Sequence, residues 1–153
     1  MSAPLADDVL DRVFRTARTA NSYTDQPVGE GTLHALYDLL KRGPTSSNQQ
    51  PLRIVWCMSA ETKAKLAALC AEGNASKVRK APVTAVLGMN MDFVKLLPRL
   101  FPYADARPWY VGNQALIEES AFRNFSLQGG YFIVAVRLLG PDSNPMSGFD
   151  SEK

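Results

Sequence analysis

The segment Pro44–Pro51 carries the hydroxyl and amide side chains Thr-Ser-Ser-Asn-Gln-Gln and no charge. Short side chains of this kind can hydrogen-bond a heteroaromatic ring or a phosphate without adding a charge to the site. Ser, Thr, Asn and Pro are also the usual residues of turns, so composition alone favours a plain loop between a helix and a strand. Position along the chain must therefore decide between these two interpretations.

Three further groups could contact a bound molecule. Arg18, together with Asn21, follows a predicted helix and could place its guanidinium on a phosphate. Asn74 and Lys77 stand three residues apart, so on a helical turn they share a face and could meet the polar edge of a ring. The small-residue turn Pro145–Gly148 would let backbone N–H groups approach a ligand closely. Taken singly, each group is equally typical of a solvated surface or an ordinary turn.

Other features exclude whole classes of chemistry. The single histidine, His34, and the two cysteines, without a CxxC pair, argue against a His/Cys zinc site and predict no metal site. The sequence contains no GxSxG, GxGxxG or GxxxxGK[ST] motif, so neither a nucleophile elbow nor a Rossmann or P-loop site is available. We therefore predict no catalytic side chain, and expect the chemistry of any enzyme here to come from a bound cofactor. The aromatic segment from Phe101 to Tyr110 could cover a substrate or be an anchored surface loop.

Composition describes an ordinary globular chain. The 153 residues are 46% hydrophobic and 21% charged, which fits one domain spanning 1–153. The net charge of +2 is too small to predict binding to nucleic acid or to an anionic membrane. The apolar stretch 124–136 is too short to cross a bilayer, and residues 1–8 show no secretory signal. We therefore expect a cytoplasmic protein.

Hydrophobic periodicity predicts five helices and two strands. The expected helices cover 5–17, 32–42, 60–71 with Ser59 as N-cap, 92–100 ending near Pro98, and 114–139 ended by Gly140-Pro141; the expected strands cover 53–58 and 83–89. The helix over 114–139 is apolar on most sides between Phe122 and Val136, which predicts burial all round, and Gly129-Gly130 would permit another backbone to approach. Two strands make a marginal sheet, so we expect further strands from a continuation of the chain or from a partner.

The order and spacing of these groups resemble those of a known family. Arg18-Thr-Ala-Asn21 precedes Gly43-Pro44-Thr-Ser-Ser-Asn48-Gln-Gln50-Pro51, which is followed by Asn74-x-x-Lys77 and Pro145-Met-Ser-Gly148-Phe-Asp150. This series resembles the FMN-dependent nitroreductase family. Leu100-Phe101-Pro102, Asp105-Ala106-Arg107 and Glu119–Asn124 make the chain most similar to its malonic semialdehyde reductase subgroup, which acts in pyrimidine catabolism.

The resemblance implies a fold and a site. The fold would be α+β, with a central, mostly antiparallel sheet flanked by helices and a long, buried helix at a dimer interface. FMN would lie between the two subunits of a homodimer. Its phosphate and ribityl end would meet Arg18 and Asn21, and its pyrimidine edge would meet Asn74 and Lys77. The remaining contacts would come from the loop residues Pro44, Thr45, Ser46, Asn48 and Gln50, partly of the second subunit, and from the backbone of Pro145, Met146, Ser147 and Gly148 near flavin N5.

The implied reaction is hydride transfer from NAD(P)H through flavin N5 to a small carbonyl compound, such as malonic semialdehyde, or to a nitro compound. Two departures from the family pattern stand out. Asn21 occupies a position where the family often has a basic residue, and family members continue beyond Gly148-Phe-Asp150, so the domain is expected to be C-terminally incomplete. An alternative is therefore a non-catalytic or inactive truncated flavin-fold dimer. A third possibility, from the residues alone, is a helical interaction module built on 114–139.

Overall fold

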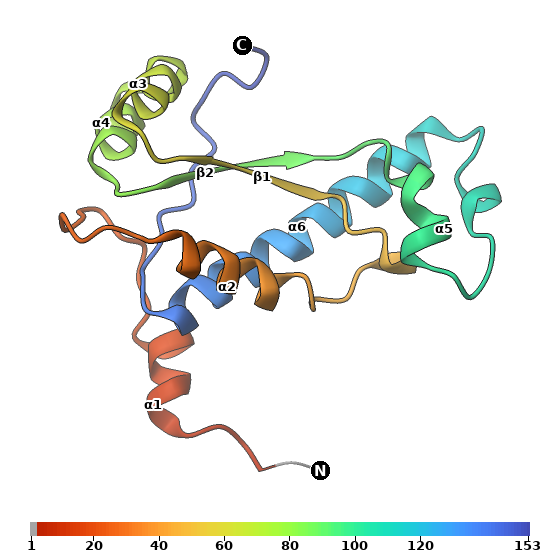
Figure 1. The fold of residues 1–153 in the computed structure, drawn as a ribbon, viewed down its shortest axis with the longest axis horizontal. Coiled ribbons are helices and arrows are strands. Elements are labelled where there is room, and N and C mark those ends of the chain that lie inside the picture. The colour runs from red at the N-terminus through yellow and green to blue at the C-terminus, as the bar shows by residue number, and fades with distance from the viewer. Residues whose placement is uncertain (1–2) are drawn as a thin grey trace.

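The computed structural model describes residues 3–153 and gives an α+β arrangement in which one long helix runs beneath a two-stranded ribbon (Figure 1). The helices are α1 (Asp7–Leu10), continued by a π-helical turn over Asp11–Arg15, then α2 (Glu30–Leu40), α3 (Ala60–Leu69), α4 (Glu72–Lys80), α5 (Leu97–Leu100) and α6 (Gln114–Leu139). Short 3₁₀ turns cover Ser46–Asn48, Phe93–Leu96 and Arg107–Trp109. The strands are β1 (Leu52–Cys57) and β2 (Thr84–Met89).

The two predicted strands pair with each other. β1 and β2 are antiparallel, with Leu52 opposite Met89 and Cys57 opposite Thr84. β-branched and aromatic residues fill β1, as expected for a strand that packs on one face. In the part of the chain that the structure describes, the sheet has these two strands, plus an isolated bridge between Cys70 and Phe149.

Helix α6 has the bounds that the sequence predicts, because both of its ends carry strong local signals. The Asn113 side chain accepts a hydrogen bond from the backbone N–H of Leu116 at 3.0 Å and caps the first turn. Gly140 ends the helix with a φ of 115°, a left-handed conformation that suits glycine. Ser59 caps α3 in the predicted way, by accepting from the N–H of Thr62.

Two predictions of local structure were wrong. The basic segment 73–80, for which no element was predicted, lies in helix α4. Pro98 does not end a helix over 92–100; it stands in the first turn of α5, where a proline loses no intrahelical hydrogen bond. A 3₁₀ turn over Phe93–Leu96 precedes it.

The hydrophobic core is divided among three clusters. Phe93 and Leu97 pack with Tyr110 and Ala121 near the start of α6. Leu36 of α2 packs against Ala135 and Val136 near the end of α6. A third cluster, of small residues, joins α3 to α4 through Ala67, Ala75 and Val78. The long helix thus contributes to two of the three clusters and is the scaffold on which the loops are placed.

The N-terminal segment closes over the end of α6. Arg12 donates from its Nε to the carbonyl of Arg137 at 2.9 Å and from Nη2 to the carbonyl of Gly140 at 2.7 Å. Arg137 returns a hydrogen bond to the carbonyl of Val13. These contacts add side-chain donors to two carbonyls at the end of α6, of which that of Arg137 also accepts from the N–H of Gly140.

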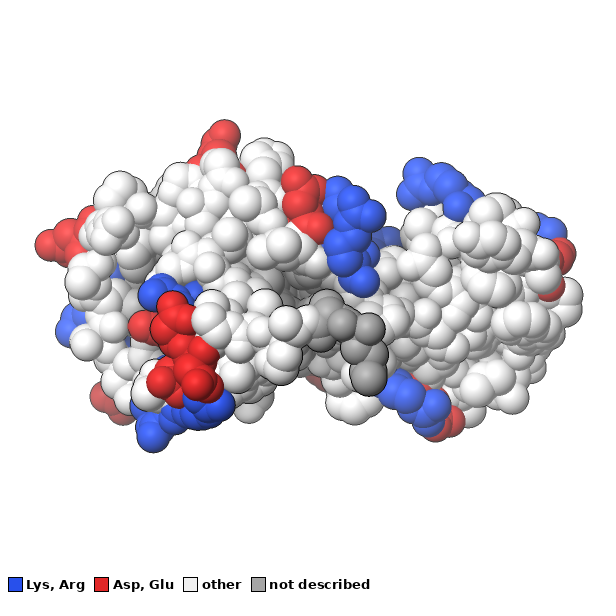
Figure 2. Space-filling view, turned by 90° about the horizontal axis from the view of Figure 1, so that it is seen from below, with Lys and Arg blue, Asp and Glu red and all other residues white. Residues whose placement is uncertain are grey.

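The surface carries both signs of charge. In the face seen in Figure 2, Lys and Arg alternate with Asp and Glu among broad uncharged areas, with no single basic patch on this face. Among residues 3–153, no helix has both the length and the apolar character needed to cross a bilayer.

Candidate functional site

The loop between α2 and β1 is tied to a buried polar stripe on α6. Asn124 Oδ1 accepts from the backbone N–H of Ser46 at 2.8 Å, and Ser120 Oγ accepts from Gln49 Nε2 at 3.0 Å. Gln128 accepts from the N–H of Leu52 at 2.9 Å and donates to Gln50 Oε1 at 2.5 Å, the last of several bonds spaced along the loop. Every turn of this part of α6 therefore holds a different point of the loop.

The loop backbone is strained. Ser47, Asn48 and Gln50 have φ values of 51°, 49° and 45°, in the left-handed region that non-glycine residues avoid. Each such residue costs roughly 1–3 kcal/mol and persists only where its surroundings fix it; such residues cluster at functional sites. Gln49 between them is fully buried, which anchors the centre of the loop. Strain therefore marks this loop as more than a connection.

Ser120, Asn124 and Gln128 were missed by sequence reasoning. They lie four residues apart on one face of α6, and all three are buried. The signal was present in the sequence: three polar residues at i, i+4 and i+8 within a helix judged apolar on most sides. Since buried polar side chains need hydrogen-bond partners, that spacing predicts a polar segment packed against the helix.

A second cluster forms around α4 and the C-terminal segment. Lys77 Nζ donates to Asn21 Oδ1 at 3.1 Å, and Asn74 Nδ2 donates to the carbonyl of Gly148 at 3.2 Å. The carbonyl of Gly148 also accepts from the N–H of Ala71 at 2.9 Å. The structure thus brings together predicted site residues from three segments separated by about 50 to 130 positions in the sequence.

Gly148 lies directly against the side chain of Asn74. A Cβ at this residue would lie 2.8 Å from Asn74 Nδ2 and 3.5 Å from the Cβ of Ala71. Met146 packs against the small-residue core between α3 and α4, and it fixes the turn before Gly148. Pro145 and Ser147 remain exposed beside it.

The segment with Arg18 and Asn21 runs beside the end of the chain. The N–H of Ala20 donates to the carbonyl of Ser143 at 3.1 Å, and Asn144 Nδ2 donates to the carbonyl of Ala20. The exposed Arg18 bonds the carbonyl of Ala17 at 2.7 Å through Nη1. Its guanidinium therefore lies close to its own backbone.

The two groups of predicted site residues lie at opposite ends of β1 (Figure 1). The loop 44–50 precedes Leu52, the first residue of β1, whereas α3 and α4 follow its last residue, Cys57. A strand of six residues spans about 17–20 Å. Pro44, Thr45, Ser46, Asn48 and Gln50 therefore do not meet Asn74, Lys77 and Gly148 within one chain.

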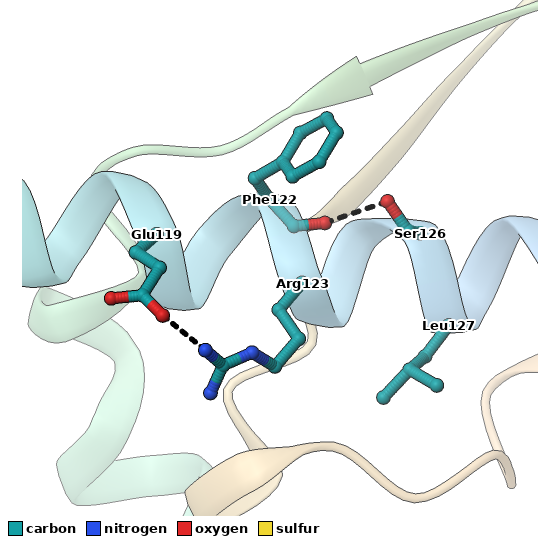
Figure 3. Close-up of a pocket in the computed structure, with 5 residues that line it drawn as sticks. All are labelled: Glu119, Phe122, Arg123, Ser126 and Leu127. Carbon is teal, nitrogen blue, oxygen red and sulfur yellow. Dashed lines mark hydrogen bonds and ion pairs between the residues drawn. The ribbon is translucent and has the colours of Figure 1, made fainter.

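Several apolar side chains of α6 are exposed. Phe122 is 63% exposed and Leu127 50%, whereas Tyr131, on the opposite side of the helix from Phe122, is 44% exposed and lies against Gly43. Figure 3 shows Phe122 and Leu127 with the Glu119–Arg123 ion pair around a shallow hollow on this helix. Apart from the adjacent residues and the backbone of α6 itself, no heavy atom among the described residues lies within 4 Å of a Cβ built on Gly129 or Gly130, so the predicted close approach is not made within this chain. The expected all-round burial of α6 is likewise wrong for the single chain.

The aromatic segment lies next to the strained loop. Asn48 Nδ2 donates to the carbonyl of Leu100 at 2.7 Å, and the Ser47 and Tyr110 hydroxyls are 3.5 Å apart. Beyond this contact, Arg107 holds Asp105 by two side-chain hydrogen bonds of 2.8 Å. These bonds, with one from the Arg107 N–H, lower the pKa of Asp105 to about 2.

Comparison with known proteins places the chain in a family. The model of the nitroreductase family matches residues 14–153. A *Burkholderia lata* protein provisionally named NADH dehydrogenase/NAD(P)H nitroreductase is 55% identical over 149 residues, covering 97% of this chain and 76% of that protein. A *Stenotrophomonas maltophilia* protein of the same provisional name is 52% identical over 153 residues, covering all of this chain and 78% of that protein.

Solved structures share the fold. A provisionally assigned nitroreductase from *Exiguobacterium sibiricum*, solved in complex with FMN, superposes with a TM-score of 0.84 at 19% identity, covering 99% of this chain and 80% of that one. A provisionally assigned NAD(P)H:FMN oxidoreductase from *Staphylococcus epidermidis* gives 0.82 at 16% identity, covering 95% and 75%. The chain therefore belongs to the nitroreductase family of oxidoreductases, and the family, enzyme class and α+β fold predicted from the sequence are confirmed.

Proposed function

We propose that this chain is an FMN-dependent oxidoreductase that uses NAD(P)H to reduce a small carbonyl or nitro compound. The observation that carries the proposal is the cluster at α4, where Asn74 bonds the carbonyl of Gly148 and Lys77, one helical turn away, bonds Asn21. The names of the relatives and the FMN in the *Exiguobacterium* structure support it.

The residues present fit FMN. A flavin phosphate requires cations, and its ring requires uncharged hydrogen-bonding groups and close approach of backbone. Arg18 and Lys77 offer the charge, Asn21 and Asn74 offer amides, and Gly148 offers the bare backbone. When bound, FMN supplies the hydride-carrying chemistry, which protein side chains lack.

Each segment then has a binding role in this proposal. Arg18 and Asn21 hold the phosphate and ribityl end, and Lys77, oriented by its bond to Asn21, places its charge at the pyrimidine edge with Asn74. The backbone of residues 145–148 lies along the central ring. No side chain is required as an acid or a base, and the protein contributes binding and orientation.

A homodimer completes the site in this proposal. Because the loop 44–50 and the Gly148 cluster lie at opposite ends of β1, one ring can be enclosed only if a second copy supplies the loop. The exposed Phe122 and Leu127 on α6 give such a copy apolar side chains on which to pack. The open backbone at Gly129-Gly130 would let the two α6 helices approach closely. FMN would then lie at the subunit interface.

The substrate class is the finest part of the proposal. Similarity to the malonic semialdehyde reductase subgroup suggests a small aldehyde that carries a carboxylate. Support from the fold is the exposed Arg107, which stands in the aromatic segment joined to the loop. Rates of NADPH and NADH oxidation with malonic semialdehyde and with a nitrofuran, at saturating FMN, distinguish this substrate from a general nitro compound.

The binding test uses FMN fluorescence quenching and absorbance in the flavin bands. Arg18→Ala should weaken FMN binding about ten- to a hundredfold, because a charge-assisted contact contributes roughly 1.5–3 kcal/mol. Arg79→Ala is the matched control, since Arg79 is exposed on α4 outside the predicted site. A wild-type chain that takes up no FMN overturns the proposal. FMN uptake without any NAD(P)H oxidation leaves the non-catalytic alternative.

A further inference from the structure

Helix α6 carries, on one face, a row of side chains whose hydrogen-bonding groups are directed to a single loop. Ser120, Asn124 and Gln128, here called the α6 ladder, are 8%, 2% and 3% exposed. Each costs free energy when buried unless its polar atoms are paired. The helix could satisfy its packing with apolar residues at these positions, so the ladder calls for an explanation other than core formation.

The partners of the ladder are spaced along the strained loop. Asn124 fixes the N–H of Ser46, Ser120 fixes the side chain of Gln49, and Gln128 fixes the N–H of Leu52. Between these fixed points lie Ser47, Asn48 and Gln50, the three residues with positive φ. No glycine in residues 44–51 relieves the strain, so the conformation depends on the hydrogen bonds that hold it, both within the loop at Thr45 and from α6.

What the ladder holds in place is the outward side of the loop. Pro44, Ser46 and Asn48 are exposed, while Gln49 and Pro51 are buried against the protein. Asn124 itself is oriented by its Nδ2, which donates to the carbonyl of Ser120 at 2.8 Å. The direction in which Ser46 is presented thus follows from one side chain that is itself fixed.

We infer that the α6 ladder consists of positioning residues that preset the loop 44–50 for the flavin ring before FMN arrives. This inference rests on the proposed function, since the ligand of the loop is the proposed FMN. Because the same helix presents Phe122 and Leu127 outward, the proposed dimer contact and the shape of the loop are set by one rigid element. A preset loop lowers the ordering cost of binding, so the ladder contributes affinity without touching the ligand.

The test compares three variants of the whole chain. Asn124→Ala removes the acceptor of the Ser46 N–H, and Ser120→Ala removes only the acceptor of Gln49 Nε2. Gln114→Ala is the matched control, because Gln114 is an exposed amide in the first turn of α6 and its side chain bonds only Glu118 of the same helix. Amide hydrogen exchange is measured without FMN, followed by FMN affinity and the visible circular dichroism of the chain saturated with FMN.

Asn124→Ala should raise the exchange rate of the Ser46 amide at least tenfold, raise the Kd for FMN about tenfold and alter the visible circular dichroism. The exchange rates of the β2 amides should be unchanged, and the Gln114→Ala control should behave as the wild type. A purely structural role would lower Tm but leave the spectrum of the saturated protein as in the wild type, and that result overturns the inference. Should Asn124→Ala not fold, Ser120→Ala carries the same comparison.

The two proposals fail in different ways. Faster exchange at Ser46 with an unchanged Kd and spectrum overturns the positioning role while FMN binding stands. If the wild-type chain does not bind FMN, the proposed function is overturned, and so is the assignment of the α6 ladder to the flavin. If the amide exchange rate of Ser46 is unchanged in Asn124→Ala, then Asn124 does not fix the loop and the positioning role of the α6 ladder is overturned.

Discussion

The loop 44–50 and the Gly148 cluster belong to the same proposed site, yet they are built in opposite ways. The loop is strained, anchored by buried amides and backed by the core around Phe93. The cluster lies over a core of small residues and is joined by single bonds between partly exposed side chains. The loop half of the proposed site is therefore fixed by buried contacts, whereas the Gly148 half depends on a few contacts between partly exposed side chains.

The largest expected contrast is in the two supporting cores. Phe93→Ala should lower the free energy of unfolding by about 3–5 kcal/mol, because it removes a large, fully buried side chain beneath the loop. Val78→Ala, beneath the cluster, should cost about 1.5–3 kcal/mol. Urea denaturation measures both, with Phe14→Ala as a control, since that side chain is 64% exposed. Equal losses of unfolding free energy in Phe93→Ala and Val78→Ala would contradict the proposed difference between the two supporting cores.

The next contrast lies within the cluster. Gly148→Ala should destabilise the chain by about 0.5–1.5 kcal/mol, because the new methyl group would lie 2.8 Å from Asn74 Nδ2 and displace it from its hydrogen bond to the Gly148 carbonyl. Gly73→Ala is the matched control: nothing lies within 4 Å of its Cβ, and α4 should gain up to about 1 kcal/mol of stability. Thermal unfolding measures both. A stable Gly148→Ala would mean that the cluster is looser than the structure shows.

The smallest effect concerns the exposed pair beside the loop. The pKa of Asp105 is about 2 in the folded chain, below its ordinary value of 3.8, because Arg107 donates hydrogen bonds to it. A lowered pKa in the folded state favours folding above about pH 4, and the contribution is lost as pH falls through about 2. Arg107→Ala should return the pKa toward 3.8, which an NMR titration of the Asp105 carboxyl would detect. An unmoved titration midpoint would show that Arg107 does not hold the carboxylate in solution.

The sequence was most informative where local signals act alone. Asn113 and Gly140 delimit α6, and the β-branched run before Cys57 marks β1. It was least informative where tertiary contacts decide. The segment 73–80 has the poor helix formers Gly73 and Asn74 in its first turn and becomes helical under packing by Ala75 and Val78.

For the candidate site too, the residues that sequence motifs mark could be predicted, whereas those defined by tertiary contacts could not. The resemblance, which covers these residues as a series, selected Asn21, Asn74, Lys77 and Gly148, and two hydrogen bonds made by α4 connect them. The ladder could not be recognised from turn chemistry or family motifs, since its meaning lies in what packs on the helix. Positive φ at Ser47 and Gln50 has no local sequence signature, because glycine and, less often, Asn are the residues that adopt it readily.

The clamp of Arg12 on the last carbonyls of α6 couples distant parts of the molecule. Trimming the chain before residue 13 would free one end of the helix whose middle fixes the loop 44–50. Shortened versions would then lose ligand affinity although every contact residue is retained, and a tag or deletion placed there would resemble a binding-site mutation.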